Sequence, residues 1–468
     1  MEQIESVIKQ IDDIVWGVPL IVLILSCGII LTIKTKFLPI RKLGKGFKYM
    51  IHDDDSGSGD VSSFAALCTA LSATVGTGNI VGVATAVSTG GAGALFWMEL
   101  AALFGMATKY AEGLLAIKYR TVDKNGSILG GPFYYIENGM GTKWRWLAKL
   151  FAFFGVFAGI MGIGTFTQIN GITSAVKGFF DPASENVVSL LGRDYSVCVI
   201  IAGIIITILA ALVLIGGLKR ISAFAQVVVP AMIILYIGCC LLILITHITS
   251  IPAAIVEIFE SAFGIRPVVG GIAGISIVVL SAQKGIARGI FSNEAGLGSA
   301  PIAASAAKTN EPVRQGLVSM IGTFIDTIIV CTMTGLSIVI SGSHSKGLEG
   351  VDITVDAFAN GLPFPREAAS FILMICLSVF AFTTILGWNY YSERCLTYLL
   401  GHHKGIQAAY RWIYIAAIFI GPYLTVEAVW DIADIFNGLM ALPNIAALLV
   451  LSGTVKRETE DYLARTGD

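Results

Sequence analysis

Charged residues are scarce in this chain. Asp, Glu, Lys and Arg make up 13% of the 468 residues, whereas 55% are hydrophobic, and the mean hydropathy is +0.79. Soluble domains carry about 25% charged residues. The shortage of charge therefore excludes an ordinary soluble protein and predicts an all-α protein that crosses a lipid bilayer many times. The net charge of −1, without any basic cluster with interleaved aromatic residues, also excludes a nucleic-acid-binding protein.

The patterns of common catalytic and metal sites are missing as well. None of the eight cysteines forms a CxxC pair and most lie in apolar runs, so we expect buried free thiols rather than disulfides or metal ligands. The five histidines fall in predicted loops or at span ends. The chain has no HExxH motif and no intramembrane His pair or Ser–His couple. We therefore expect neither an enzyme nor a bound cofactor, and no obligate protein partner is evident.

Eleven apolar stretches are long enough to cross a bilayer as helices. Ten are expected at about residues 14–33, 61–87, 93–116, 147–176, 197–215, 224–245, 317–340, 368–388, 410–426 and 432–450, and the seventh of the eleven begins near residue 267. The first stretch is too long for the core of a signal peptide, and no small-residue cleavage site follows it. We therefore expect this stretch to be retained as a transmembrane helix.

Lysine and arginine are distributed unevenly between the two predicted sides of the membrane. All but seven of the 31 fall in segments on one side. The exceptions are Lys9, Lys177, Arg193, Arg266, Lys346 and Arg366 on the other side, and Lys109 within a span. Because cytoplasmic loops are enriched in Lys and Arg, we expect the N-terminus outside and the C-terminus in the cytoplasm. The expected location is a cell membrane, the inner membrane of a prokaryote, with lipid as the surrounding partner.

The second span contains Gly76-Thr77-Gly78-Asn79, among the poorest helix formers that a membrane crossing can use. In hydrocarbon every backbone N–H and C=O needs a partner inside the protein. A span that breaks at mid-depth can give its free N–H groups to an anionic group and its free C=O groups to a cation. Close packing against a neighbouring helix is the alternative interpretation, because small residues also permit that.

A second glycine-rich interruption opens the seventh span, at Gly270-Gly-Ile-Ala-Gly274-Ile-Ser276. With the first span set aside, ten spans form two inverted groups of five, and each group begins with a broken helix. Paired breaks in two inverted halves indicate the binding site of a secondary transporter. We therefore expect an extra helix and a basic loop in residues 1–60, five-helix repeats in 61–250 and 251–455, and a cytoplasmic tail in 456–468. Eleven helices with scattered glycines are the alternative.

Five segments resemble the alanine-or-glycine:cation symporter family. They are Gly76–Asn79, Gly105–Glu112, Gly130–Glu137, Phe291–Pro301 and Gly387–Cys395. The resemblance covers most of the chain and implies the leucine-transporter-type fold of the amino acid-polyamine-cation superfamily. It also implies a sodium gradient as the energy source and a small neutral amino acid, alanine or glycine, as the substrate that is carried into the cell.

Substrate contacts are expected at both interruptions, because alanine and glycine offer a carboxylate, an ammonium and almost no side chain. The candidate residues are Gly76, Thr77, Gly78, Asn79, Phe166, Gln168, Gly271, Gly274, Ile275, Ser276, Thr384 and Trp388. N–H groups of the first interruption, with the Asn79 amide, suit the carboxylate, and carbonyls of the second, with the Gln168 oxygen, suit the ammonium. Phe166 and Trp388 would form apolar walls. Interhelical hydrogen bonds for the two amides, and packing for the two aromatics, are the alternatives.

Sodium takes about five or six oxygen ligands, which carbonyls and hydroxyls can supply without a full charge. Resemblance to the sodium sites of this fold implies that Thr383 and Thr384 meet the carbonyls of Ser72 and Val75 across the bundle, with Thr74 as a further candidate. Back-bonding of both threonines to their own helix is the alternative. The apolar part of the sixth span has no lysine, whose ammonium would replace sodium in a proton-coupled relative. We therefore expect co-transported sodium.

Asp326 places a charge within a predicted span, so it is a functional candidate that could pair with Lys109 or bias the sodium site. Glu99 and Glu112 lie nearer the ends of their span, and we interpret them as structural. The sequence predicts a secondary active transporter that carries alanine or glycine with sodium by alternating access. A symporter of the same fold for another small substrate, or for protons, is the nearest alternative. A channel is disfavoured because the chain lacks a short repeated pore loop and a ring of acids.

Overall fold

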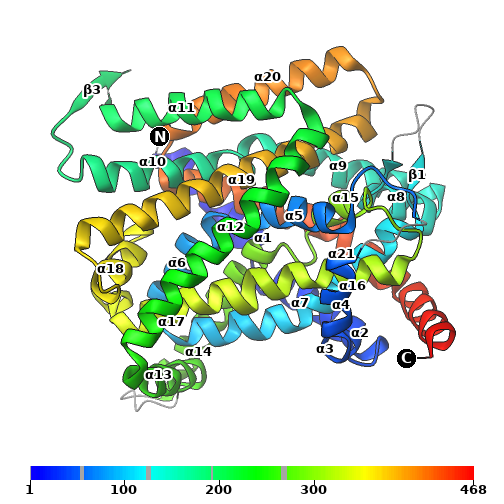
Figure 1. The fold of residues 1–468 in the computed structure, drawn as a ribbon, viewed down its shortest axis with the longest axis horizontal. Coiled ribbons are helices and arrows are strands. Elements are labelled where there is room, and N and C mark those ends of the chain that lie inside the picture. The colour runs from blue at the N-terminus through cyan, green and yellow to red at the C-terminus, as the bar shows by residue number, and fades with distance from the viewer. Residues whose placement is uncertain (1, 53–56, 123–127, 191–192, 265–270, 468) are drawn as a thin grey trace.

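The protein is described by a computed structural model over residues 2–52, 57–122, 128–190, 193–264 and 271–467 (Figure 1). Almost all of it is helical. The strands form two short antiparallel hairpins, β1 (Thr121–Val122) with β2 (Ile128–Leu129) and β3 (Val187–Leu190) with β4 (Arg193–Ser196). Within the described residues, eight helical segments are long and apolar enough to cross a membrane, and a bent pair makes a possible ninth. The helical, membrane-spanning fold class is confirmed, and the count of eleven stays a prediction.

The helices of the first half lie between Glu2 and Thr246. These helices are α1 (Glu2–Val15), α2 (Val18–Lys34), α3 (Leu38–Arg41), α4 (Leu43–Ile51), α5 (Ser63–Thr74), the π-helix η1 (Gly78–Gly82), α6 (Val83–Gly90), α7 (Gly93–Lys118), α8 (Pro132–Tyr134), the π-helix η2 (Tyr135–Gly139), the 3-10 helix η3 (Thr142–Trp144), α9 (Arg145–Met161), α10 (Phe166–Phe180), α11 (Val197–Leu214) and α12 (Gly217–Thr246). Glycines let α7 approach its neighbours closely, since a Cβ on Gly113 would lie 2.3 Å from Ser319 Oγ.

The second half begins after Thr246. Its elements are η4 (Ile248–Ser250), α13 (Ile251–Phe263), α14 (Gly271–Asn293), α15 (Ala300–Ala304), α16 (Pro312–Thr323), the π-helix η5 (Phe324–Cys331), α17 (Thr332–Ser341), η6 (Ser343–Ser345), α18 (Val351–Gly361), α19 (Arg366–Leu400), α20 (Lys404–Ile420), η7 (Gly421–Tyr423) and α21 (Val426–Thr466). Figure 1 shows α11 and α20 along one flank and α5 near the centre. The loop expected at residues 341–365 contains α18, which rests on η1 because Thr354 Oγ1 donates to the Ile80 carbonyl at 3.4 Å.

The first interruption lies where the sequence predicts it. Helix α5 ends at Thr74, Val75 has an extended ψ of 95°, and η1 begins at Gly78. The two halves of this span meet at an angle of 54°. Every residue from Leu71 to Val83 is buried, so the break lies inside the protein. This span is therefore interrupted inside the protein. The alternative, close packing against a neighbouring helix, applies as well, since a Cβ on Gly76 would lie 2.5 Å from Thr384 Oγ1 of α19.

The second interruption lies about 20 residues beyond its predicted position. Residues 271–276 form the first turns of the continuous helix α14, and residue 270 lies outside the described residues. A helix tolerates interior glycines at a cost of about 1 kcal/mol each, so glycines alone do not end it. The helix ends where φ becomes positive, at Glu294 (55°), Gly296 (92°) and Gly298 (81°), because such residues cannot continue a right-handed helix.

From the sequence we expect a cytoplasmic loop at Phe291–Pro301, but residues 291–299 are all buried, so this segment is not a solvent-exposed loop. Lys284 and Arg288, which we count on the same predicted side, lie within α14. Arg288 pairs with Asp434 of α21, with 2.9 Å between its nitrogen and the carboxylate oxygen. The second broken helix therefore consists of α14 and the short helix α15, with the six residues 294–299 between them.

The N-terminal helices α1 and α2 are part of the packed bundle. Trp16 Nε1 donates to the Asp434 carbonyl of α21 at 2.6 Å, and a Cβ on Gly438 would lie 2.4 Å from Val15. Ile24 of α2 lies beside Gly296, at 3.3 Å from the position of a Cβ there. The extra helix predicted before the repeats thus contacts the second interruption directly.

Candidate functional site

The backbone N–H groups of the first interruption are held by side-chain amides. The Gly76 N–H donates to Asn79 Oδ1 at 2.9 Å, and the Thr77 N–H donates to Gln168 Oε1 of α10 at 3.1 Å. Within the described residues the buried Thr77 hydroxyl has no hydrogen-bond partner. These are the N–H groups that the sequence assigns to a substrate carboxylate. In this structure they donate to two amide oxygens instead.

Space at the first interruption is limited by its neighbours. A Cβ on Gly76 would lie 2.5 Å from Thr384 Oγ1 and 2.9 Å from Gln168 Oε1. A Cβ on Gly78 would lie 3.3 Å from both the Phe291 ring and Ser292 Cα, at the end of α14. The two interrupted helices therefore meet at Gly78, and only a residue without a side chain fits at Gly76.

Asn79 and Asp326 connect the first interruption to η5. Asn79 Nδ2 donates to the Asp326 backbone carbonyl at 3.1 Å and to its Oδ1 at 2.9 Å. The other carboxylate oxygen accepts hydrogen bonds of 2.8 Å from the hydroxyls of Ser292 and Thr327. Asp326 is fully buried, and in the described part of the chain it forms no ion pair, with Lys109 or with any other cation. A buried carboxylate without a cationic partner is a favourable place for a small cation.

A second group of oxygens lies between α5 and α19. The hydroxyls of Thr383 and Thr384 both donate to the Phe380 carbonyl, at 2.8 and 3.2 Å, and Thr384 also reaches the Val75 carbonyl at 3.3 Å. Thr383 additionally contacts Met232 of α12, at 3.6 Å from its sulfur. The two interpretations of this threonine pair thus both apply: each bonds back to its own helix, and Thr384 also bonds across the bundle.

The second interruption is fixed by side chains from distant helices. Trp388 Nε1 donates to the Glu294 carboxylate at 2.8 Å, and Ser299 donates to the same group. Glu112 of α7 accepts from the Gly296 N–H at 3.2 Å, and Asn444 of α21 donates to both Glu112 Oε1, at 2.7 Å, and the Gly296 carbonyl, at 2.8 Å. These bonds satisfy the backbone groups that the broken helix leaves open.

The structure brings most of the predicted residues together but not all of them. One cluster contains Val75, Gly76–Asn79, Gln168 and Thr384. Ser72 lies where Gly387 of α19 closely approaches α5. Thr74 lines a neighbouring cavity, and Trp388 lies at the second interruption, deep in α19 rather than at a span end. Phe166 instead packs with Ala417 and Val429, away from the cluster. Gly271, Gly274, Ile275 and Ser276 belong to the continuous helix α14, so their proposed role as a carbonyl-rich break was wrong.

Four site residues were missed from the sequence in this role: Ser292, Glu294, Glu112 and Asn444. Ser292 and Glu294 belong to a segment noted only for its family resemblance and assigned to a loop. A signal was present there, because Gly296 and Gly298 are separated by a single residue in a segment with two further small polar residues. Glu112 was interpreted as structural, and its bonds to Gly296 and Asn444 show that it supports the second interruption.

The fold is shared with secondary transporters. The crystal structure of MhsT in complex with L-phenylalanine matches with a TM-score of 0.54 at 12% identity, over 86% of this chain and 98% of that chain. The structure therefore has the leucine-transporter-type fold. The two interrupted helices meet in the interior of this fold, where Gly78 lies against Phe291 and Ser292.

The chain belongs to the sodium:alanine symporter family, which it matches over residues 1–467. It is 52% identical to an uncharacterized transporter of Haemophilus influenzae, over 99% of this chain and 97% of that relative. It is 44% identical to the sodium/alanine symporter AgcS of Methanococcus maripaludis, over 98% of this chain and 97% of that relative. The family resemblance recognised in the sequence is confirmed. The protein is a sodium-coupled amino-acid symporter, and it is a multi-pass membrane protein.

Proposed function

We propose that the protein carries alanine or glycine into the cell together with sodium, by alternating access. One observation carries the proposal: the two interrupted helices meet where Asn79 of the first binds Asp326, which also binds Ser292 at the end of α14. The buried backbone and polar groups at this meeting point match a zwitterion and a small cation in their chemistry. The name of AgcS, at 44% identity, pairs the same two ligands.

The substrate carboxylate is proposed to bind the N–H groups of Gly76 and Thr77. Both N–H groups now donate to amide oxygens, of Asn79 and Gln168, so rotation of these two amides would release them. The unpartnered Thr77 hydroxyl supplies a third donor. The lack of room for even a Cβ on Gly76 supports a substrate as small as alanine or glycine.

Sodium is proposed to bind at the two groups of oxygens described above. The carbonyls of Val75 and Phe380 with the hydroxyls of Thr383 and Thr384 provide four neutral oxygens. Asp326 provides a carboxylate at the second place, within reach of the Asn79 side chain. Both places contact the first interruption, so a bound cation would hold it in the shape that the substrate needs. Each ligand would then raise the affinity of the other by the same factor.

The proposed orientation puts the N-terminus outside, with inverted repeats in residues 61–250 and 251–455. Contacts between loops support it, because they join segments that the sequence assigns to the same side. On the proposed cytoplasmic side, Arg120 donates to the carbonyls of Ser58, Ala307 and Thr309 at 2.6–2.8 Å. Each repeat would begin with an interrupted helix, α5–α6 in the first and α14–α15 in the second.

A barrier of the kind that alternating access requires covers the second interruption on the side of the N-terminal helix. Arg288 pairs with Asp434, and its guanidinium lies over the rings of Phe291 and Trp430, at 5.5 and 5.1 Å from their centroids. Phe291 directly precedes Ser292 of the site. We propose that this barrier closes the outer entrance in the present state and opens when α14 moves relative to α21.

Uptake of labelled alanine into proteoliposomes tests the proposal. We expect uptake to rise at least tenfold when an inward sodium gradient replaces an equal potassium gradient, and excess unlabelled glycine to compete with it. Liposomes without protein are the control. Equal uptake in sodium and potassium would refute sodium coupling. Competition by leucine as strong as that by glycine would favour the alternative, a symporter for a larger substrate, and uptake driven by a proton gradient alone would favour a proton-coupled one.

A further inference from the structure

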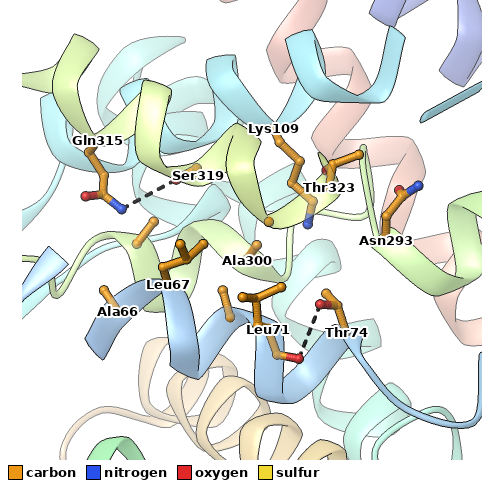
Figure 2. Close-up of a pocket in the computed structure, with 13 residues that line it drawn as sticks. Ala66, Leu67, Leu71, Thr74, Lys109, Asn293, Ala300, Gln315, Ser319 and Thr323 are labelled. Atoms are coloured by element: carbon orange, nitrogen blue, oxygen red, sulfur yellow. Dashed lines mark hydrogen bonds between the residues drawn. The ribbon is translucent and has the colours of Figure 1, made fainter. Parts of the chain in front are cut away.

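A buried ammonium near the two interruptions is not used by the function proposed above. Lys109 lies in the middle of α7 and is 3% exposed. Figure 2 shows its side chain extending from α7 into the space between α5 and α16, with Thr323 beside it. Within the described residues its Nζ has no hydrogen-bond partner. An unpaired ammonium in a protein interior is costly, so its retention calls for groups that stabilise it.

The ammonium faces a small cavity whose lining is mostly apolar but includes six polar residues. The polar residues that line it are Thr74, Lys109, Asn293, Gln315, Ser319 and Thr323. About 20 Å³ is open to the centre of a water molecule, and roughly 10–15 Å³ is enough for one water. Thr323 Oγ1 and Gln315 Oε1 are also buried and without partners in the described part of the chain. A water that accepts from Lys109 and donates to Gln315 would satisfy both residues and leave the ammonium free to shift.

Lys109 is also linked by its charge to both interruptions. Its positive charge acts on the carboxylates of Asp326, Glu294 and Glu112. Asp326 holds Asn79 of the first interruption, Glu294 lies in the second, and Glu112 accepts from the second at Gly296. One ammonium therefore partly neutralises the three carboxylates that contact the broken helices, without forming an ion pair with any of them.

We propose that Lys109 is a positioning residue that sets the sodium affinity of the transporter. Its ammonium is an internal cation that competes with sodium for the field of the carboxylates, and the cavity beside it gives the ammonium room to move away when sodium arrives. The inference rests on the proposed sodium coupling. Removal of its charge should strengthen cation binding near Asp326 by about tenfold or more, since nearby charges interact strongly in a protein interior.

The test compares Lys109→Met with Lys109→Arg and with Lys118→Met, a matched control at the exposed end of the same helix. The readout is the sodium concentration for half-maximal alanine uptake in proteoliposomes, with the alanine concentration for half-maximal uptake measured at saturating sodium. We expect Lys109→Met to lower the sodium value about tenfold or more and to change the alanine value less than twofold. Lys109→Arg, which keeps the charge, and Lys118→Met should both stay within about twofold of the wild type.

The outcomes separate this inference from the proposed function. If the wild type shows no sodium dependence, sodium coupling itself fails. If the wild type depends on sodium and Lys109→Met has an unchanged or higher sodium requirement, the inference about Lys109 is overturned. Should Lys109→Met not transport at all, sodium-dependent thermal stabilisation of the purified protein replaces uptake as the readout. The variant must then reach half of its maximal stabilisation at about tenfold less sodium than the wild type, and an unchanged midpoint again overturns the inference.

Discussion

Asn79 binds Asp326 through two hydrogen bonds and thereby joins the two π-helical segments η1 and η5. The same Asn79 side chain accepts from the Gly76 N–H, so one amide connects the first interruption, η1 and a buried carboxylate. π-helical turns are rare in proteins, and those that occur often lie at functional sites. Because two of them meet across a single amide, a change at the carboxylate would reach, through Asn79, the backbone proposed to bind the substrate.

Replacement of Asn79 by Ala should therefore damage transport strongly. The change leaves the Gly76 N–H and Asp326 Oδ1 without the partner that Asn79 provides, and each buried unsatisfied group costs about 1–3 kcal/mol. We expect kcat/KM for alanine to fall at least about tenfold and Tm to decrease. Asn138→Ala, at an exposed position, should leave both values unchanged. Wild-type transport by Asn79→Ala would contradict the role assigned to the amide.

Gly76 and Gly82 provide a matched pair on the same interrupted helix. A Cβ on Gly76 would lie 2.5 Å from Thr384 Oγ1, whereas a Cβ on Gly82 would have no atom within 4 Å. Gly76→Ala should therefore reduce alanine uptake at least about tenfold, because Thr384 or Gln168 must move away. Gly82→Ala should keep uptake near the wild-type level. The measurement is initial uptake rate per folded transporter, and equal rates for the two variants would show that the close contact is unimportant.

The two neighbouring threonines of α19 should differ in their effect on sodium. The Thr384 hydroxyl donates to the Val75 carbonyl of the first interruption, whereas in the described part of the chain the hydrogen bonds of the Thr383 hydroxyl go to Phe380 and Met232. Valine keeps the shape of threonine but removes the hydroxyl oxygen. We expect Thr384→Val to raise the half-maximal sodium concentration about tenfold, and Thr383→Val to raise it less. A larger effect of Thr383→Val would move the sodium site toward α12.

Asp356 lies in α18, on the proposed outer side, and its carboxyl should make the stability of the protein depend on pH. Burial alone would raise the pKa of Asp356, but hydrogen bonds from Lys346, at 2.5 Å, and Ser343, at 2.7 Å, hold this pKa below its ordinary value. A carboxyl with a lowered folded-state pKa adds stability above its unfolded pKa, about 4, and loses that contribution as the pH falls through the folded value.

The Tm of the wild type should therefore exceed that of Asp356→Asn at about pH 6, and the difference should shrink as the pH falls toward about 3. Thermal unfolding of the purified protein over this pH range gives both values. Lys346→Met should show the same trend, because it removes the donor that lowers the pKa. A Tm difference that stays constant with pH would mean that the Asp356 carboxyl does not contribute through its charge.

The first interruption could be predicted from the sequence because its signal is local. Two glycines and an asparagine inside an apolar run leave no regular helix at that position, and the structure breaks there. The contact of Thr384 with Val75 also followed the expectation. In both cases the chemistry of the residues themselves decides the outcome, since glycine lacks a side chain and threonine carries an oxygen into an apolar span.

The second interruption could not be located in this way because distant residues decide it. Gly271 and Gly274 continue a helix, whereas Gly296 ends one, and the difference lies in its partners. Glu112 and Asn444, which bind the backbone of Gly296, are separated from it by 184 and 148 residues. A glycine permits a positive φ but does not require it, so its conformation depends on contacts that no local pattern contains. The same reason hid α18 within an apparently irregular loop.

The contact between Thr354 and Ile80 couples α18, in this loop, to the first interruption. Helix α18 rests on η1, so a molecule that binds α18 would also restrain η1. In the proposed transport cycle η1 must change its conformation. An antibody fragment that binds residues 351–361 from the aqueous surface would therefore inhibit transport. It would stop the cycle without entering the permeation pathway and without competing with the amino acid.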